Sequence, residues 1–167
     1  LDICGSNVHH FGVLNEKIRF PEKDNEIKFS LSFGCPIAHP SVMAKRHIFK
    51  KYPYNSNTTA AEDYDLWCRM AVDGVKFGNC QDYLLNYRMH PDQATKTNII
   101  HHKNSIKIAK EYAKIYLIDE NHSRFLTLNC GFNGQYSTQQ VNEILNILIG
   151  VMKNRKVSSQ TLGRYLV

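Results

Sequence analysis

The spacing of apolar residues predicts helices in the second half of the chain. From residue 141 to 152, apolar side chains recur at the i, i+3, i+4 and i+7 positions of one helix face, and Ser137 with Gln140 forms a capping box before them. That face consists of Val141, Ile144, Leu145, Leu148, Ile149 and Met152. A second helix is predicted over residues 98–117, with an apolar side made of Ile99, Ile106, Ala109, Ala113 and Tyr116. A last short helix is predicted after Ser158 and Ser159.

The first half mixes strand patterns with short helical ones. Residues 1–13 predict a buried strand, and Pro21 interrupts the polar stretch that follows. Two more strands are predicted over residues 75–79 and 83–89. Short helical or irregular segments are predicted over residues 27–33 and 45–51, and a constrained loop over residues 34–43 runs into a short strand. Together the patterns predict an α/β fold, with a mixed sheet, flanking helices and a C-terminal helical tail.

Composition narrows the class of protein. A chain of 167 residues is the size of one domain, and no apolar run approaches the ~20 residues of a membrane span. The first residues show neither the basic nor the apolar region of a signal peptide, and no initiator Met is present, so we expect a portion of a longer protein. Five scattered cysteines without a Cys-x-x-Cys pair indicate reduced thiols and a cytoplasmic location.

The charge balance favours anionic partners. The net charge is +6, and four lysines, spaced i, i+4, i+7 and i+11, form a stripe on the predicted helix 98–117. They are Lys103, Lys107, Lys110 and Lys114. Such a stripe is either a solvated face or a face that rests on an anionic membrane. Nucleic acid is not an expected partner, because no nucleic-acid motif is present and no aromatic residues alternate with the lysines.

Two adjacent carboxylates stand at the start of a third predicted helix. Glu62 and Asp63 precede the apolar side chains of Leu66, Trp67 and Met70, which have helical spacing, and Asp73-Gly74 predicts where the helix ends. A carboxylate fixed at a helix start can cap backbone N–H groups. It can also present a proton acceptor to a cleft.

Three segments, in this order and spacing, resemble the C-terminal half of family 2 glycosyltransferases with the GT-A fold. They are Gly34-Cys-Pro-Ile-Ala-His-Pro-Ser-Val-Met43, Ala61-Glu-Asp-Tyr-Asp-Leu-Trp67 and Leu85-Asn-Tyr-Arg-Met-His-Pro-Asp-Gln93. The opening Gly5-Ser-Asn-Val8 also looks like the strand that follows the nucleotide-binding half of those enzymes. The resemblance covers about residues 1–95 and implies the acceptor-side half of a GT-A catalytic domain. Residues 96–167 are then expected to form a helical region packed on it.

The resemblance assigns roles to seven side chains. It implies that Asp63 is the catalytic base of an inverting glycosyl transfer, that Glu62 is its partner, and that Leu66 and Trp67 anchor the helix in the core. His90 and Arg88 would approach the diphosphate or its metal, although a histidine hydrogen-bonded within a loop explains His90 equally well. His39 would line the acceptor cleft, with a purely structural histidine as the alternative.

The expected metal is a divalent ion, Mg or Mn, in the full-length enzyme. Asp63-Tyr64-Asp65 spells the Asp-x-Asp metal signature of the family, but here the letters fall in a helix start, where Asp65 favours the helix dipole. The expected signature and the donor-binding half are absent from the sequence. No metal ligand is certain, with His90 as a candidate, and the pairs His9/His10 and His101/His102 have no carboxylate or cysteine at ligand spacing.

These assignments imply partners and one alternative. The full-length protein would use a nucleotide-sugar donor and a carbohydrate or lipid-linked acceptor in surface polysaccharide synthesis, at the inner face of the membrane. The fragment alone is expected to be inactive and to self-associate where its missing N-terminal half exposes apolar surface. The alternative is a non-catalytic carbohydrate-binding or assembly module that has kept the fold.

Overall fold

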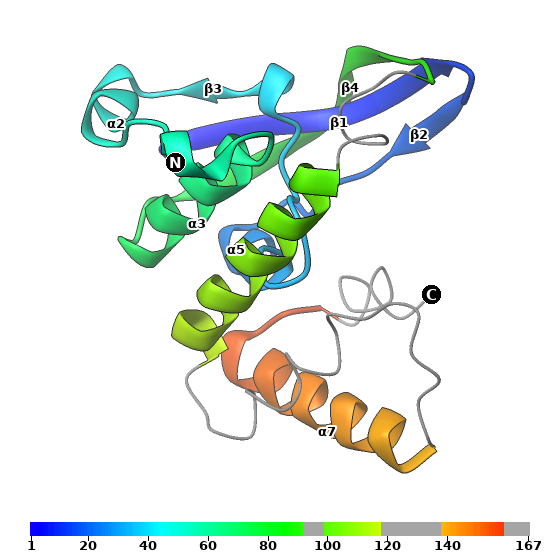
Figure 1. The fold of residues 1–167 in the computed structure, drawn as a ribbon, viewed down its shortest axis with the longest axis vertical. Helices are drawn as coiled ribbons and strands as arrows, with labels where there is room; N and C mark the ends of the chain where they lie inside the picture. Colours follow the sequence, from blue (N-terminus) through cyan, green and yellow to red (C-terminus); the bar gives the residue numbers. More distant parts are fainter. Residues whose placement is uncertain (92–98, 118–137, 159–167) are drawn as a thin grey trace.

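The computed structural model describes residues 1–91, 99–117 and 138–158 (Figure 1). Within them, one mixed sheet is built around the central strand β1 (Ile3–Gly12). β1 pairs antiparallel with β2 (Glu16–Ile18) and β3 (Met43–Ala44), and parallel with β4 (Phe77–Met89). The predicted α/β class, with a mixed sheet and flanking helices, is confirmed, and it is consistent with a partial GT-A domain (Figure 1).

The sheet corrects the prediction of two strands over residues 75–79 and 83–89. A single strand, β4, covers residues 77–79 of the first and all of the second. Its register against β1 shifts from Ser6↔Cys80 to Asn7↔Tyr83 and again at Val8↔Leu85. The buried Asn7 amide stabilises this bulge, because its Nδ2 donates to the Gln81 carbonyl and its Oδ1 accepts from the Phe20 N–H. Residues 80–82, which separate the two predicted strands, therefore belong to a bulge inside one long strand. The short strand β2 was not predicted.

Short helices connect the strands of the first half. They are α1 (Asp24–Ser30), η1 (His39–Ser41), α2 (Arg46–Lys51) and η2 (Ser56–Thr58), followed by α3 (Glu62–Val72). The helices predicted over residues 45–51 and after Ala61 are thus confirmed. The segment predicted as helical or irregular over residues 27–33 is helical only to Ser30, and α1 begins earlier, at Asp24. α3 ends as predicted at Gly74, whose φ of +82° suits a residue without Cβ, and the Val75 N–H bonds back to the Met70 carbonyl.

The core lies where α3 packs on the sheet. Leu66, Trp67 and Met70 are fully buried, together with Ile3 of β1 and Phe77 of β4. The predicted anchoring of α3 by Leu66 and Trp67 is therefore confirmed. Burying three such side chains contributes several kcal/mol of the free energy of folding and fixes how the first turn of α3 meets the sheet.

Two long helices follow, α5 (Ile99–Leu117) and α7 (Thr138–Arg155). Both helices are confirmed, but the predicted apolar side of α5 is wrong in part, since Ile99 and Ile106 are exposed. α5 instead buries Ile108 and Tyr112 against α3, and the Tyr112 hydroxyl donates to the Lys28 carbonyl. No helix in the described ranges combines the length and apolarity needed to cross a bilayer.

The end of α7 packs against α1. The Asn25 amide donates to the carbonyls of Arg155 and Lys156, and Leu148 and Val157 are buried with Phe29. The predicted cap at Ser137 and the helix predicted after Ser159 lie outside the described residues. The division of the chain at about residue 95 stays a prediction.

Candidate functional site

The two predicted catalytic carboxylates occupy the first turn of α3. Glu62 is exposed, whereas Asp63 is half-buried, and its Oδ1 accepts a hydrogen bond of 2.7 Å from the Tyr64 N–H. No other hydrogen bond joins the Asp63 carboxylate to the part of the chain that the structure describes. The helix dipole stabilises both negative charges here. Asp63 therefore lies at the mouth of the helix with one carboxylate oxygen available to accept a proton.

The backbone before this turn is strained. Ala60 has a φ of +66°, in the left-handed region that residues with a Cβ seldom occupy. The helix cap, Ala61, has no side chain that could hydrogen-bond to the first turn. Asp63 takes over that function, which explains why the chain tolerates an alanine at the cap position. Strain of this kind is concentrated at functional sites.

A histidine and a tyrosine from two different loops meet beside this turn. His39 opens η1, and its Nε2 lies 2.8 Å from the hydroxyl of Tyr54 in the loop before η2. The His39 ring also lies over Trp67, with 6.0 Å between ring centroids. Trp67 is fully buried one turn after Asp63, so it forms a rigid support for the imidazole.

The charges of α3 reach Tyr54. Partial desolvation, followed by the negative charges of Asp63 and Glu62, raises the pKa of the Tyr54 hydroxyl. The hydroxyl thus stays protonated, and it donates to His39 Nε2 in the tautomer that carries its proton on Nδ1 and accepts from Nε2 in the other. The structure brings together three of the predicted site residues, Glu62, Asp63 and His39. Tyr54 was not predicted, because its turn-rich loop carries no motif.

Cys35 is a second site neighbour that the sequence did not predict. The residue is exposed, and its thiol donates to the Ile37 carbonyl within the loop before η1. Desolvation of the sulfur, with the negative charge of Asp63, raises the pKa of the thiol to about 12. Cys35 is therefore a neutral thiol at the edge of the site rather than a nucleophile.

The other two predicted site residues, Arg88 and His90, lie farther along the sheet than the His39 loop does. Arg88 pairs with Phe11 near the end of β4, and His90 follows that strand. The loop of His39 crosses β1 near its other end, where the Ser41 hydroxyl accepts from the Ser6 N–H. Ser6 and Phe11 are five positions apart, or roughly 17 Å along a strand. Arg88 and His90 therefore lie apart from the His39 loop along the sheet, where the Arg88 guanidinium carries a positive charge.

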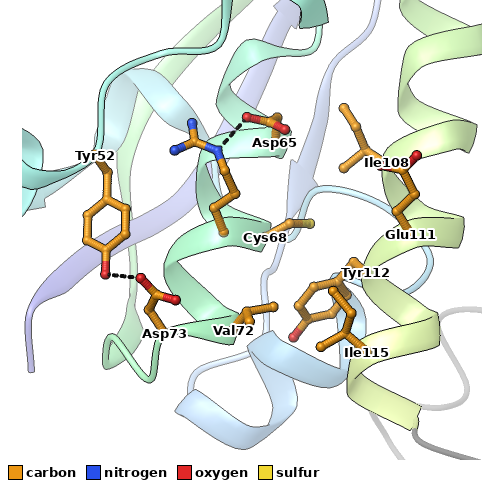
Figure 2. Close-up of a pocket in the computed structure, with 10 residues that line it drawn as sticks. Tyr52, Asp65, Cys68, Val72, Asp73, Ile108, Glu111, Tyr112 and Ile115 are labelled. Atoms are coloured by element: carbon orange, nitrogen blue, oxygen red, sulfur yellow. Dashed lines mark hydrogen bonds and ion pairs between the residues drawn. The ribbon is translucent and has the colours of Figure 1, made fainter.

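The opposite side of α3 faces a groove toward α5. Figure 2 shows Asp65 on this side, paired with Arg69 through an Nε–Oδ2 distance of 2.8 Å. The groove has a volume of about 400 Å³, and Cys68, Ile108 and Tyr112 contribute to its mostly apolar lining (Figure 2). Because Asp63 and Asp65 are two residues apart on a helix, their side chains point to opposite sides. They do not form an Asp-x-Asp metal pair.

The described residues do not form a metal site by themselves. No three His, Cys, Asp or Glu side chains gather at metal-binding distance within residues 1–91, 99–117 and 138–158. A divalent ion at this site would need ligands from outside the described residues. The residues that are present can supply a proton acceptor at Asp63 and hydrogen bonds from the His39 imidazole and the Tyr54 hydroxyl. The buried Trp67 ring lies against the imidazole.

Comparison with known proteins now adds to this geometry. The chain is 27% identical to the O-antigen biosynthesis glycosyltransferase WbnJ of Escherichia coli over 119 residues, which is 68% of this chain and 46% of that protein. It is 39% identical to the uncharacterized glycosyltransferase MJ1057 of Methanocaldococcus jannaschii over 51 residues, 30% of this chain and 18% of the relative. It is 35% identical to the bifunctional glycosyltransferase pgtA of Dictyostelium discoideum over 101 residues, 57% of this chain and 13% of the relative.

All three relatives are named glycosyltransferases. The matches are partial and of low identity, and together they support a glycosyltransferase family for this chain. The chain spans less than half of the length of each relative. No family model matches the sequence, and no solved structure matches it either.

Proposed function

We propose that this chain is the acceptor-side part of a nucleotide-sugar-dependent, inverting glycosyltransferase of family 2 with a GT-A fold. The observation that carries the proposal is the half-buried Asp63 carboxylate at the start of α3, beside the His39–Tyr54 pair. The three glycosyltransferase relatives support the same class of reaction. By analogy with the O-antigen relative, we place the full-length protein in surface polysaccharide synthesis, on the cytoplasmic side of the membrane.

Asp63 is the general base in this proposal. An acceptor hydroxyl attacks the anomeric carbon of the donor sugar while the free oxygen of Asp63 takes the hydroxyl proton. The bond between the anomeric carbon and the diphosphate breaks, and the diphosphate leaves with the electron pair. Because the acceptor attacks from the side opposite the leaving group, the anomeric configuration inverts. Glu62, exposed on the same turn, faces the approaching acceptor.

His39 and Tyr54 orient the acceptor. Their hydrogen bond fixes the imidazole and the hydroxyl at the rim of the site, where both can contact sugar hydroxyls. Trp67 beneath the imidazole prevents it from turning into the core. The chemistry requires this rigidity, since a reacting oxygen displaced by about 1 Å can cost roughly 100-fold in rate.

In this proposal the Arg88 guanidinium supplies positive charge toward the departing diphosphate, and His90 approaches it from the same end of β4. Such charge stabilises the negative charge that develops on the leaving group. A divalent ion would add to this effect in the full-length enzyme, with ligands that the described residues do not provide. The fragment holds the acceptor side only, and we expect no transferase activity from it alone.

The test compares two neighbouring aspartates in the full-length gene product. Asp63→Asn is expected to lower kcat by about 10²- to 10⁴-fold, as removal of a general base does. Asp65→Asn, on the opposite side of α3, is the matched control and is expected to change kcat less than about threefold. If Asp63→Asn keeps more than a tenth of the activity, Asp63 is only a helix cap, and a non-catalytic carbohydrate-binding module becomes the better interpretation.

A further inference from the structure

The outer face of α5 combines four lysines with exposed apolar side chains. Lys103, Lys107 and Lys114 are exposed, and Lys110 is half-buried. Ile99 and Ile100, in the first turn of the helix, are 69% and 55% exposed, and Ile106 is 40% exposed. At 100° per residue, the four lysines fall within one narrow stripe, with Ile99 and Ile106 along one border and Ile100 along the other. We call this stripe and its borders the lysine face.

Within the described residues, ion pairs do not neutralise the lysine face. The single carboxylate of α5, Glu111, lines the groove toward α3, and within the described residues no ion pair joins any of the four lysines to an acidic group. Like charges at i, i+4 destabilise a helix by roughly 0.2–0.5 kcal/mol per pair. The stripe contains two such pairs, and Glu111, four residues after Lys107 and three before Lys114, offsets part of this repulsion. An anionic partner that covers the stripe would remove the rest.

The exposed isoleucines decide which partner fits. A face with lysines along its centre and aliphatic side chains at its borders matches the boundary between lipid headgroups and acyl chains. Proteins bind single-stranded nucleic acid by stacking its bases on aromatic side chains. The exposed apolar side chains of the lysine face are aliphatic, so they do not provide such stacking. A second copy of the chain would bring two positive faces together.

We propose that the lysine face of α5 docks on an anionic phospholipid bilayer. In this arrangement the helix lies in the plane of the surface, the lysine ammonium groups contact lipid phosphates, and Ile99, Ile100 and Ile106 enter the headgroup boundary. The opposite, buried side of α5 stays packed on α3, so docking requires no unfolding. The proposal does not depend on the chemistry assigned to Asp63.

The test is co-sedimentation of the full chain with vesicles. We expect the chain to bind vesicles of phosphatidylcholine with 30% phosphatidylglycerol. Its affinity for vesicles of phosphatidylcholine alone is expected to be lower by roughly tenfold or more. The test variant changes Lys103, Lys107, Lys110 and Lys114 to Gln. The matched control removes the same charge at four other lysines, Lys23, Lys50, Lys153 and Lys156, which are all exposed. Circular dichroism spectra of the variants and the parent chain check that each variant is folded.

The stripe and control variants distinguish binding through the lysine face from binding through the overall net charge. The stripe variant is expected to lose at least about tenfold in affinity for the anionic vesicles, while the control variant stays within about twofold of the parent chain. A second variant, Ile99→Ser with Ile106→Ser, is expected to bind at low salt and to dissociate at lower salt than the parent chain does. Equal losses in the stripe and control variants would overturn the proposal. So would the absence of binding by the parent chain, or tighter stripe-dependent binding to an oligonucleotide than to vesicles.

Discussion

The Nε2 atom of His39 and the hydroxyl of Tyr54 lie 2.8 Å apart beside the start of α3, although their loops are separated by β3 and α2. Neither residue belongs to α3, yet the charges of its first turn influence the Tyr54 hydroxyl. The rim of the site is therefore built from three segments that the sheet and α3 hold together. This arrangement makes each contributor testable on its own.

Tyr54→Phe removes the hydrogen bond to His39 and leaves the ring in place. A hydrogen bond of this kind contributes about 0.5–1.5 kcal/mol, so we expect kcat/KM of the full-length enzyme to fall about two- to tenfold, mainly through KM for the acceptor. Steady-state kinetics with acceptor and donor varied separately measure this. Tyr52→Phe is the matched control, because it removes a hydroxyl bonded to Asp73 away from the site. A larger effect on the donor KM than on the acceptor KM would contradict the assignment.

Cys35 reports on Asp63 without any assay of activity. With a pKa of about 12, less than about a thousandth of the Cys35 thiol is thiolate at pH 8.5, so alkylation by iodoacetamide is expected to be slow in the folded chain. Asp63→Asn removes a negative charge that raises this pKa, so the labelling rate should increase. Peptide mapping by mass spectrometry gives the rate at Cys35, and the urea-unfolded chain gives the unperturbed rate. An unchanged rate in Asp63→Asn would show that the two groups are not close.

The same pKa shift gives the sign of a pH effect on stability. The folded state binds the Cys35 proton more tightly than the unfolded state does, so the contribution to stability is complete below the ordinary thiol pKa of 9.0. It decreases as the pH rises from there toward 12. We expect Cys35→Ser to reduce the fall in the free energy of unfolding between pH 8 and pH 10, as measured by urea denaturation.

Gly5→Ala is expected to destabilise the chain. A Cβ at Gly5 would lie 2.4 Å from Oδ1 of the buried Asn79, whose amide nitrogen is held by the carbonyls of Pro21 and Pro36. Asn79 cannot move without losing these bonds, so we expect a loss of about 2–3 kcal/mol in the free energy of unfolding. Gly150→Ala in α7 is the control. Nothing lies within 4 Å of its added methyl group, and alanine favours the helix by about 1 kcal/mol.

Asn7→Ala tests the bulge in β4. The Asn7 side chain satisfies the Gln81 carbonyl and the Phe20 N–H, and alanine would leave both groups without their partner. We expect a loss of about 2–4 kcal/mol and faster hydrogen exchange at the Phe20 amide. Exchange measured by NMR resolves the effect by residue. If protection at Phe20 persists, the side chain of Asn7 does not hold the bulge.

The sequence predicted elements whose signal is periodic. α3 and α7 were predicted correctly because their apolar residues repeat with helical spacing, and Gly74 marks where α3 ends. The apolar side of α5 was wrong at Ile99 and Ile106, since their apolar character alone does not tell which side a neighbouring helix covers. The bulge in β4 was missed because its stabilising partner, Asn7, lies more than 70 positions away.

The candidate site also contains residues that the sequence predicted and residues that it did not. The motifs brought attention to Asp63 and His39, and the structure places them in one neighbourhood. Tyr54 and Cys35 belong to that neighbourhood through loop packing, which no local pattern encodes. Arg88 and His90 could be placed only after the register of β4 against β1 was known, because that register fixes how far along the sheet they lie.

The parallel pairing of β1 with β4 sets an order for folding during synthesis. More than sixty residues separate the two strands, whereas β1 and β2 are joined by a short hairpin. The hairpin can therefore form as soon as it leaves the ribosome, but one edge of β1 stays unpaired until Met89 has emerged. A ribosome stalled before Phe77 would carry a nascent chain whose central strand is open to pairing with other chains, so this stage of synthesis is the one most exposed to aggregation.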